Sequence, residues 1–120
     1  MNIFMVREGV VITPPITDNI LEGITRRSVM DLLRQELGLT LVERPIDRTE
    51  VYLCDEFFMT GTAAQITAVT RVDYRPIGTG EMGPIVIQLR RIFEDIAYGR
   101  HPKYRHWNTP VYARVANKAL

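Results

Sequence analysis

Two short segments of the sequence contain residue types that bind anions. Gly23-Ile24-Thr25 stands where a helix is predicted to begin, and the free N–H groups and positive dipole end of a helix attract phosphate. The Thr25 hydroxyl can donate to the same anion. Gly61-Thr62-Ala63-Ala64 lies between two predicted strands, where successive N–H groups of a tight turn can form an anion-binding nest. Together they suit a ligand that has a phosphate and a carboxylate.

Each segment also has a structural explanation that involves no ligand. Thr25 suits the N-cap position of a helix, because its hydroxyl accepts an orphan backbone N–H, and small residues are common in ordinary turns. A third glycine-containing segment, residues 78–83, matches neither of the glycine-rich phosphate-binding patterns, so we interpret it as a connecting loop. The residues alone leave both explanations of the two anion segments open.

The sequence excludes several kinds of metal and redox site. Cys54 is the only cysteine, so the chain can form neither an internal disulfide nor a multi-cysteine zinc site. A lone cysteine is more often a buried apolar residue than a nucleophile. The two histidines, His101 and His106, cannot form a three-histidine site, and we place both in a solvated tail. We therefore predict no metal ligand.

Catalytic side chains are also missing from the expected places. Asp55 and Glu56 are adjacent in a predicted strand, so their side chains point to opposite faces and cannot act as a carboxylate pair. The two lysines, Lys103 and Lys118, lie near the C-terminus, whereas a Schiff-base lysine should be buried and rigid. We predict no catalytic residue in this chain.

A β-hairpin is predicted at the start of the chain. Strands are expected over residues 2–6 and 10–13, and the tight turn between them uses Gly9 in a conformation with positive φ. The polar residues 14–23 then read as a loop. This hairpin precedes the first anion segment.

The clearest predicted helix follows that loop and covers about residues 25–37. Thr25 is its expected N-cap and Gly38 its expected stop. Arg26 and Arg27 are expected on its solvated side. Its apolar face is formed by Val29, Leu32, Leu33 and Leu37.

The second half of the chain is predicted to contain two strands and a second helix. The helix covers about residues 84–98, begins at Pro84 and ends at Gly99. Its apolar stripe is Leu89, Ile92, Phe93 and Ile96. The residues from His101 onward read as an irregular tail held by Trp107. The other predicted elements are an extended segment over 39–44, a helical turn over 49–53, strands over 56–60 and 65–74, and a loop over 76–83.

Length, charge and hydropathy indicate an ordinary globular domain. The 120 residues suit one α/β domain, and 15 basic against 14 acidic residues argue against a dedicated nucleic-acid binder. No apolar run approaches the length of a membrane-spanning helix, and the N-terminus lacks the apolar stretch of a signal peptide. We expect a cytoplasmic protein without a membrane or nucleic-acid partner.

The order of these motifs resembles the C-terminal part of branched-chain amino-acid aminotransferases, which are fold-type IV enzymes that use pyridoxal 5′-phosphate (PLP). The similarity runs from Asn2 to about Tyr112. It rests on the segments Asn2-Ile3-Phe4, Gly9 to Pro15, Leu21 to Arg26, Asp55 to Ala64, Gly83-Pro84, Trp107 and Pro110-Val111.

The resemblance implies a fold and a set of site residues. The fold is a mixed β-sheet or pseudo-barrel with two main helices, and the chain is one domain, residues 1–120, from the C-terminal part of the larger, PLP-binding domain. The backbone N–H groups of Ile24 and Thr25 and the hydroxyls of Thr25 and Thr62 bind the cofactor phosphate. The N–H groups of Thr62 and Ala63 hold the substrate carboxylate, and Ala63 borders the side-chain pocket.

The chain departs from the family in what it lacks. The family's Schiff-base lysine, its glutamate for the pyridine nitrogen and an arginine of its phosphate site all precede the Asn-Ile-Phe motif. The chain therefore looks like a fragment without the N-terminal domain, inactive alone. Without that domain, exposed apolar surface should promote self-association, and the parent enzyme is expected to be a homo-oligomer. Some relatives carry a redox cysteine pair where Ala64 and Thr67 stand here, so no such switch is expected.

Two other functions compete with amino-group transfer between leucine, isoleucine or valine and 2-oxoglutarate. One is a fragment of a D-amino-acid aminotransferase or an aminodeoxychorismate lyase of the same fold type. The other is a non-catalytic domain that binds a phosphorylated ligand or a partner chain. The Gly-Ile-Thr-Arg and Glu-Phe-Phe-Met-Thr-Gly-Thr-Ala-Ala forms favour the branched-chain group.

Overall fold

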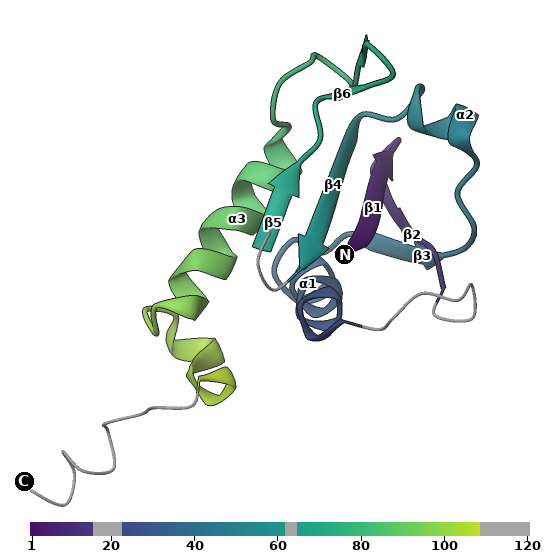
Figure 1. The fold of residues 1–120 in the computed structure, drawn as a ribbon. Coiled ribbons are helices and arrows are strands. Elements are labelled where there is room, and N and C mark those ends of the chain that lie inside the picture. The colour runs from purple at the N-terminus through teal and green to yellow at the C-terminus, as the bar shows by residue number, and fades with distance from the viewer. Residues whose placement is uncertain (16–22, 62–64, 109–120) are drawn as a thin grey trace, which may run out of the picture. The chain divides into compact units, whose positions relative to one another are not determined.

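A five-stranded mixed sheet forms the centre of the first 90 residues (Figure 1). The computed structural model describes residues 1–15, 23–61 and 65–108. The chain divides into two compact units, residues 1–90 and 91–120, and each is considered by itself. The sheet has the order β3-β2-β1-β4-β5. Its strands are β1 (Asn2–Arg7), β2 (Val10–Thr13), β3 (Thr40–Glu43), β4 (Glu56–Gly61) and β5 (Gln65–Ala68).

The predicted hairpin is confirmed. Strands β1 and β2 pair antiparallel, with Met5 opposite Ile12 and Arg7 opposite Val10. The turn consists of Glu8 and Gly9, whose φ angles are 52° and 79°. A two-residue hairpin turn with both φ angles positive matches the twist of the strands, which is why glycine is favoured there.

Helix α1 (Ile24–Gln35) connects β2 to β3, and these two strands pair in parallel. A parallel pair needs a crossover connection, and α1 packs on one face of the sheet as that crossover. The face beneath it includes Phe4 and Phe58, whose rings stack with centroids 5.1 Å apart. Val29, Leu32 and Leu33 of the predicted apolar face are buried, Leu37 is half-buried, and the predicted stop residue Gly38 has a φ of 61°.

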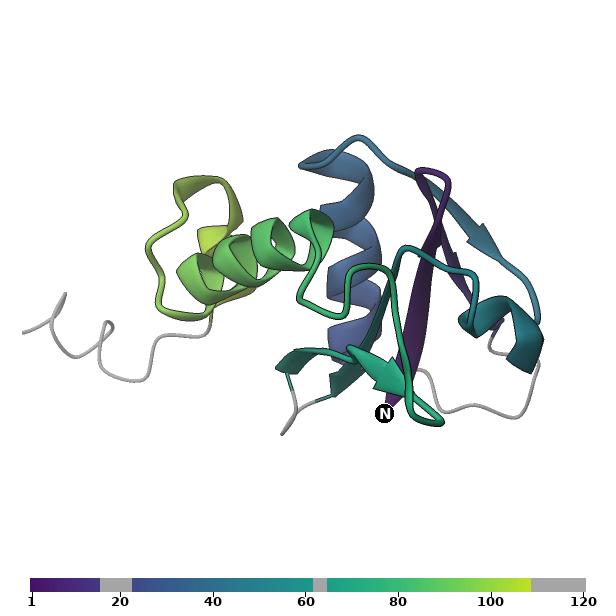
Figure 2. The same ribbon diagram turned by 90° about the horizontal axis from the view of Figure 1, so that it is seen from above.

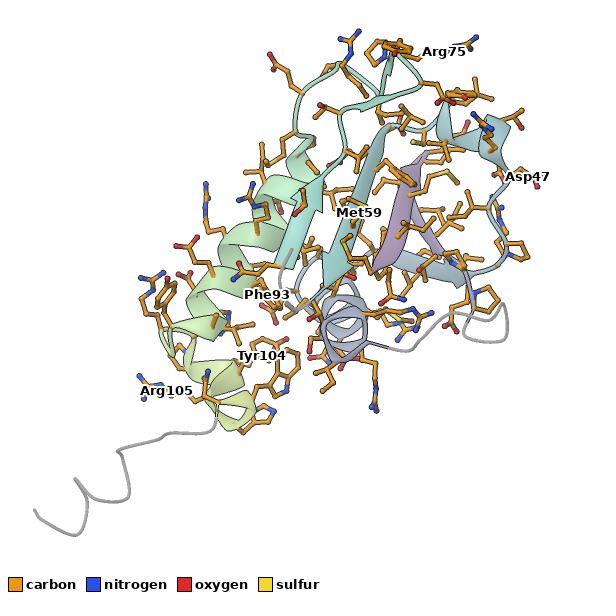
Figure 3. The ribbon with its side chains drawn as sticks, in the orientation of Figure 1. Asp47, Met59, Arg75, Phe93, Tyr104 and Arg105 are labelled. Atoms are coloured by element: carbon orange, nitrogen blue, oxygen red, sulfur yellow. The ribbon has the colours of Figure 1, made fainter. Side chains whose placement is uncertain are left out.

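The opposite face of the sheet is covered by other elements (Figure 2). A buried apolar cluster on this face is formed by Met5, Ile12, Val51, Cys54 and Ile77. It includes Val51 from the short helix α2 (Arg48–Val51), close to the helical turn predicted over 49–53. Asp47 lies just before α2 (Figure 3) and forms a capping box with Glu50. The sheet is therefore buried on both faces, with α1 and α2 on opposite sides.

The predicted strand over residues 65–74 is wrong in its length. Strand β5 ends at Ala68, and the chain continues into a small separate hairpin of β6 (Arg71–Val72) and β7 (Arg75–Pro76). Asp73 and Tyr74 have φ angles of 50° and 67°, which places a tight turn inside the predicted strand. Aromatic and β-branched residues are common in strands, but they do not show where a strand turns.

The second predicted helix is confirmed as α3 (Pro84–Ala97), followed by Gly99 with a φ of 71°. In the second unit, a 3₁₀ helix over Pro102–Trp107 replaces the irregular tail that we expected. Its Tyr104 is buried and its ring packs against Trp107, with centroids 4.7 Å apart, whereas Arg105 points outward (Figure 3). Trp107 packs in this segment, and Tyr104, which we did not single out, is the more buried residue. The assignment of all 120 residues to one domain stays a prediction.

Candidate functional site

The N-terminus of α1 presents backbone N–H groups without a capping side chain. Gly23 is the N-cap, in an extended conformation with φ −83° and ψ 146°, and its carbonyl accepts the first helical hydrogen bond from Arg27 N at 3.2 Å. As a glycine, Gly23 has no side chain with which to cap these groups. The N–H groups of Ile24, Thr25 and Arg26 therefore precede the first bond of the helix, where an anion can accept them.

The prediction that Thr25 is the N-cap is wrong. Thr25 lies within the first turn of α1 and is half-buried, whereas Ile24 before it is 83% exposed. The cap falls on Gly23, where a side chain would require the Asn2 side chain to move. A Cβ atom on Gly23 would lie 2.9 Å from Oδ1 of the buried Asn2, closer than real Cβ contacts allow. Thr25 is thus freed from capping, and its hydroxyl stays a candidate for the ligand.

Helices α2 and α3 have carboxylates at their N-termini. In α2 the Asp47 side chain accepts from the N3 backbone, while Glu50 Oε1 accepts from Asp47 N at 3.1 Å. In α3 the buried Glu56 accepts from Ile85 N at 3.2 Å and Val86 N at 3.0 Å. The first turn of α1 instead contains two arginines and no acidic residue. Its charge therefore favours an external anion.

Asn2 connects the start of α1 with the end of β4. It is adjacent to Gly23, as described above, and it pairs with Thr60 across strands β1 and β4. Gly23 of the first anion segment and Thr60, which leads into the second, are therefore both neighbours of Asn2. Thr60 is fully buried, and its hydroxyl has no hydrogen-bond partner within residues 1–15, 23–61 and 65–108.

Of the four residues in the second anion segment, the structure describes only Gly61, the last residue of β4. Thr62, Ala63 and Ala64 lie outside the described residues. The roles of Thr62 and Ala63 therefore stay predictions. Strand β4 and its pairing with Asn2 fix where this segment begins.

Arg26 does not lie on a solvated face as we predicted. It is only 2% exposed, and its Nη2 donates to Glu43 Oε1 at 2.8 Å and to Pro14 O at 3.0 Å. The spacing of the sequence contains a signal for this. Arg26 precedes the buried Val29, Met30 and Leu33 by three, four and seven residues, which places it on the same side of the helix.

The adjacent acidic residues serve separate structural purposes. The Asp55 carboxylate accepts from Glu8 N at 3.0 Å, whereas Glu56 caps α3. The prediction that they do not form a catalytic pair is consistent with these contacts. Cys54 is buried, and burial raises the pKa of its thiol to about 11. The thiol is therefore protonated at neutral pH, which supports the interpretation of Cys54 as an apolar residue.

A hollow of about 310 Å³ lies on the sheet face opposite α1. Two arginines at its rim, Arg7 and Arg44, both contact Glu50, and Arg44 binds it through two hydrogen bonds of 2.9 and 2.6 Å. These bonds lower the pKa of Glu50 to about 2. The arginines that line this hollow are therefore already paired. It is lined by Arg7, Glu8, Val10, Ile12, Val42 and Arg44.

Two further features are missing from the part of the chain that the structure describes. That part contains no group of three metal-binding side chains, and none of its helices has the length and apolar character needed to cross a membrane.

The part of the chain that contains the sheet and α1 matches a known protein family. The sequence model of the family Amino-transferase class IV matches residues 1–72. The chain belongs to this family. The mixed five-stranded sheet with α1 against it is the fold that we expected for a fold-type IV aminotransferase.

Within this family the chain is similar to branched-chain aminotransferases. It is 49% identical over 111 residues to a probable branched-chain-amino-acid aminotransferase of Aquifex aeolicus, and 42% identical over 110 residues to the Pseudomonas aeruginosa enzyme. Each match covers 92% of this chain but only 36% and 35% of the relative. The chain thus spans about a third of the length of these curated relatives.

Solved structures of branched-chain aminotransferases also match this chain. The PLP form of the branched-chain amino acid aminotransferase from Thermobaculum terrenum matches with a TM-score of 0.88 and 50% identity, over 92% of this chain and 36% of that one. The branched-chain aminotransferase from Thermoproteus uzoniensis with norvaline matches with a TM-score of 0.86 and 45% identity, again over 92% of this chain and 36% of that one.

Proposed function

We propose that this chain supplies part of the cofactor and substrate site of a PLP-dependent branched-chain amino-acid transaminase. The observation that carries the proposal is the N-terminus of α1, which has a glycine at its N-cap, a cationic first turn and the buried Asn2 beside it. The names of the similar proteins supply the substrate class and the cofactor. The substrates are accordingly leucine, isoleucine and valine and their 2-oxo acids.

The described residues fit the phosphate of PLP. Ile24 and Thr25 offer N–H groups at a helix end that has no capping side chain among the described residues, and the Thr25 hydroxyl adds a donor. Thr62 is proposed as a further phosphate ligand. Bound PLP acts as an electron sink and carries the amino group between substrates. The contribution of this chain is to bind and orient the phosphate and, through the N–H groups of Thr62 and Ala63, the substrate carboxylate.

We propose that the 120-residue chain alone does not catalyse transamination. The reaction needs a lysine that both anchors the cofactor and moves the α-proton. Lys103 is exposed on the 3₁₀ helix, and Lys118 lies outside the described residues. Incubation of the pure chain with PLP, leucine and 2-oxoglutarate should yield no 4-methyl-2-oxopentanoate above the rate with PLP alone. Turnover above that rate would contradict the proposal.

The competing functions are less well supported. The relatives and structures reported above are branched-chain aminotransferases, which favours this substrate class over D-amino acids or aminodeoxychorismate. Their greater length supports the proposal that further protein completes the site. A cytoplasmic location and a homo-oligomeric parent enzyme stay proposals, and sedimentation of the purified chain tests whether it self-associates.

A PLP titration followed by absorbance tests the proposed site. The variant Thr25→Ala/Thr62→Ala removes both proposed hydroxyl ligands. A matched control, Thr40→Ala/Thr49→Ala, removes two exposed threonines from β3 and α2. We expect saturable binding by the wild-type chain and the control and at least tenfold weaker binding by the site variant. Equal binding by all three proteins would contradict the site.

A further inference from the structure

Arg26 joins three segments of the chain at the start of α1. Its Nη2 atom donates to Pro14 O, just after β2, and to the carboxylate of Glu43, the last residue of β3. Arg26 itself lies in the first turn of α1. One side chain therefore holds the first turn of the helix against the ends of two neighbouring strands.

The burial of Arg26 costs free energy, which is unfavourable for a residue whose only role is stability. The guanidinium is 2% exposed, and its Nε has no hydrogen-bond partner among the described residues. Glu43, which balances its charge, is 43% exposed. A cation in the first turn also opposes the helix dipole, and burial of a charge costs free energy unless it is well paired. A phosphate at the N-terminus of α1 would offset both penalties.

We propose that Arg26 is a positioning residue for the cofactor phosphate, and that Glu43 acts through it. By holding the first turn of α1 against Pro14 and Glu43, Arg26 sets the direction of the N–H groups of Ile24 and Thr25. It acts through the backbone of the helix and not by contact with the cofactor. The inference rests on the proposed function, because the ligand that benefits is the PLP phosphate.

Binding measurements on four variants of the 120-residue chain test this role. Arg26→Gln should weaken PLP binding at least tenfold, and Arg26→Lys, which keeps the charge but not the planar fork, should recover part of that loss. Glu43→Ala should weaken it three- to tenfold although Glu43 is partly exposed and is not a proposed ligand. Arg34→Gln is the matched control, because it removes the same charge from an exposed arginine in the last turn of α1 and should change affinity no more than about twofold.

A second ligand separates positioning from a general loss of structure. Pyridoxal lacks the phosphate, so a role in phosphate binding predicts that Arg26→Gln and Glu43→Ala reduce the preference for PLP over pyridoxal. A merely structural role would weaken both ligands in parallel and leave that preference unchanged. An unchanged preference for PLP over pyridoxal in both variants would overturn the proposal. If Arg26→Gln does not fold, the preference measured for Glu43→Ala tests the proposal by itself.

The amide signals of the ligand-free chain distinguish this inference from the proposed function. In an ¹⁵N-labelled chain, Arg26→Lys and Glu43→Ala should shift the amide signals of Ile24 and Thr25 before any ligand is added. If the wild-type chain binds no PLP, the proposal that its phosphate site is preformed fails, but these shifts still test whether Arg26 positions the helix end. Unchanged signals of Ile24 and Thr25 in both folded variants would overturn the positioning role.

Discussion

Removal of the Glu56 carboxylate should destabilise the chain by breaking the connection between β4 and α3. Glu56 is 6% exposed, and its two oxygens accept from Ile85 N and Val86 N at 3.2 and 3.0 Å. Glu56→Ala leaves both N–H groups without this acceptor at a buried helix end. A hydrogen bond to a charged group contributes about 1.5–3 kcal/mol and a charge at a helix end about 0.3–1 kcal/mol. Because the two bonds share one carboxylate, we expect a loss of about 3 kcal/mol.

Urea unfolding followed by circular dichroism measures this loss. With a slope of about 2 kcal/mol per molar urea, a loss of about 3 kcal/mol lowers the unfolding midpoint by about 1.5 M. Glu56→Gln keeps one acceptor oxygen and should lose about half as much. The control is Glu81→Ala, an exposed acidic residue in the segment before α3, which should change stability by less than about 0.5 kcal/mol. A Glu56→Ala chain as stable as the Glu81→Ala chain would refute the assigned role of this carboxylate.

Three further predictions concern stability and reactivity. Gly78→Ala should destabilise more than Gly9→Ala in urea unfolding, since both glycines have positive φ but only at Gly78 would the new Cβ lie 2.3 Å from Asp55 O; equal losses would exclude this clash. Glu50 has a pKa of about 2 against an ordinary 4.5, so its contribution is present above pH 4.5 and is lost as the pH falls towards 2. Glu50→Gln should therefore flatten the fall of the melting temperature in that range, and an unaltered profile would contradict the assignment. Cys54, with a pKa of about 11, should resist thiol reagents at pH 8 until urea unfolds the chain, and rapid labelling of the native chain would show that the thiol is accessible.

Local signals in the sequence predict the elements of this fold well. Gly9 identifies the hairpin because a two-residue hairpin turn requires positive φ angles, which glycine adopts readily. The apolar spacing of Val29, Leu32 and Leu33 identifies α1 because only one face of a helix can be buried against a sheet. In both cases the interactions that decide the structure lie within a few residues of each other.

Predictions failed where contacts distant in the sequence decide the structure. Thr25 is a good N-cap by residue type, but the cap falls on Gly23, which lies beside the buried Asn2. Arg26 has the charge of a surface residue, but acceptors at Pro14 and Glu43 allow it to be buried. Neither Asn2 nor Glu43 is close enough in the sequence to reveal these contacts.

The candidate site was predicted as two segments, and local patterns do not show which residues neighbour the start of α1. The pairing of Asn2 with Thr60 and the closeness of Asn2 to Gly23 bring the end of β4 and the start of α1 to the same residue. Strand order is set by such non-local pairing, which periodicity does not encode. The unpartnered Thr60 hydroxyl was also missed, because a threonine in a buried strand gives no sign of whether its hydroxyl has a partner among the described residues.

The most direct test of the proposed phosphate site is a titration of the ¹⁵N-labelled chain with PLP, followed through its amide signals. We expect saturable shifts of Ile24 and Thr25, whose N–H groups follow the glycine N-cap of α1. The amides of Ile85 and Val86 serve as an internal control, since Glu56 already occupies the N-terminus of α3. They should shift little. Unmoved signals at Ile24 and Thr25, or equal shifts at both helix ends, would contradict the assignment of the phosphate site to α1.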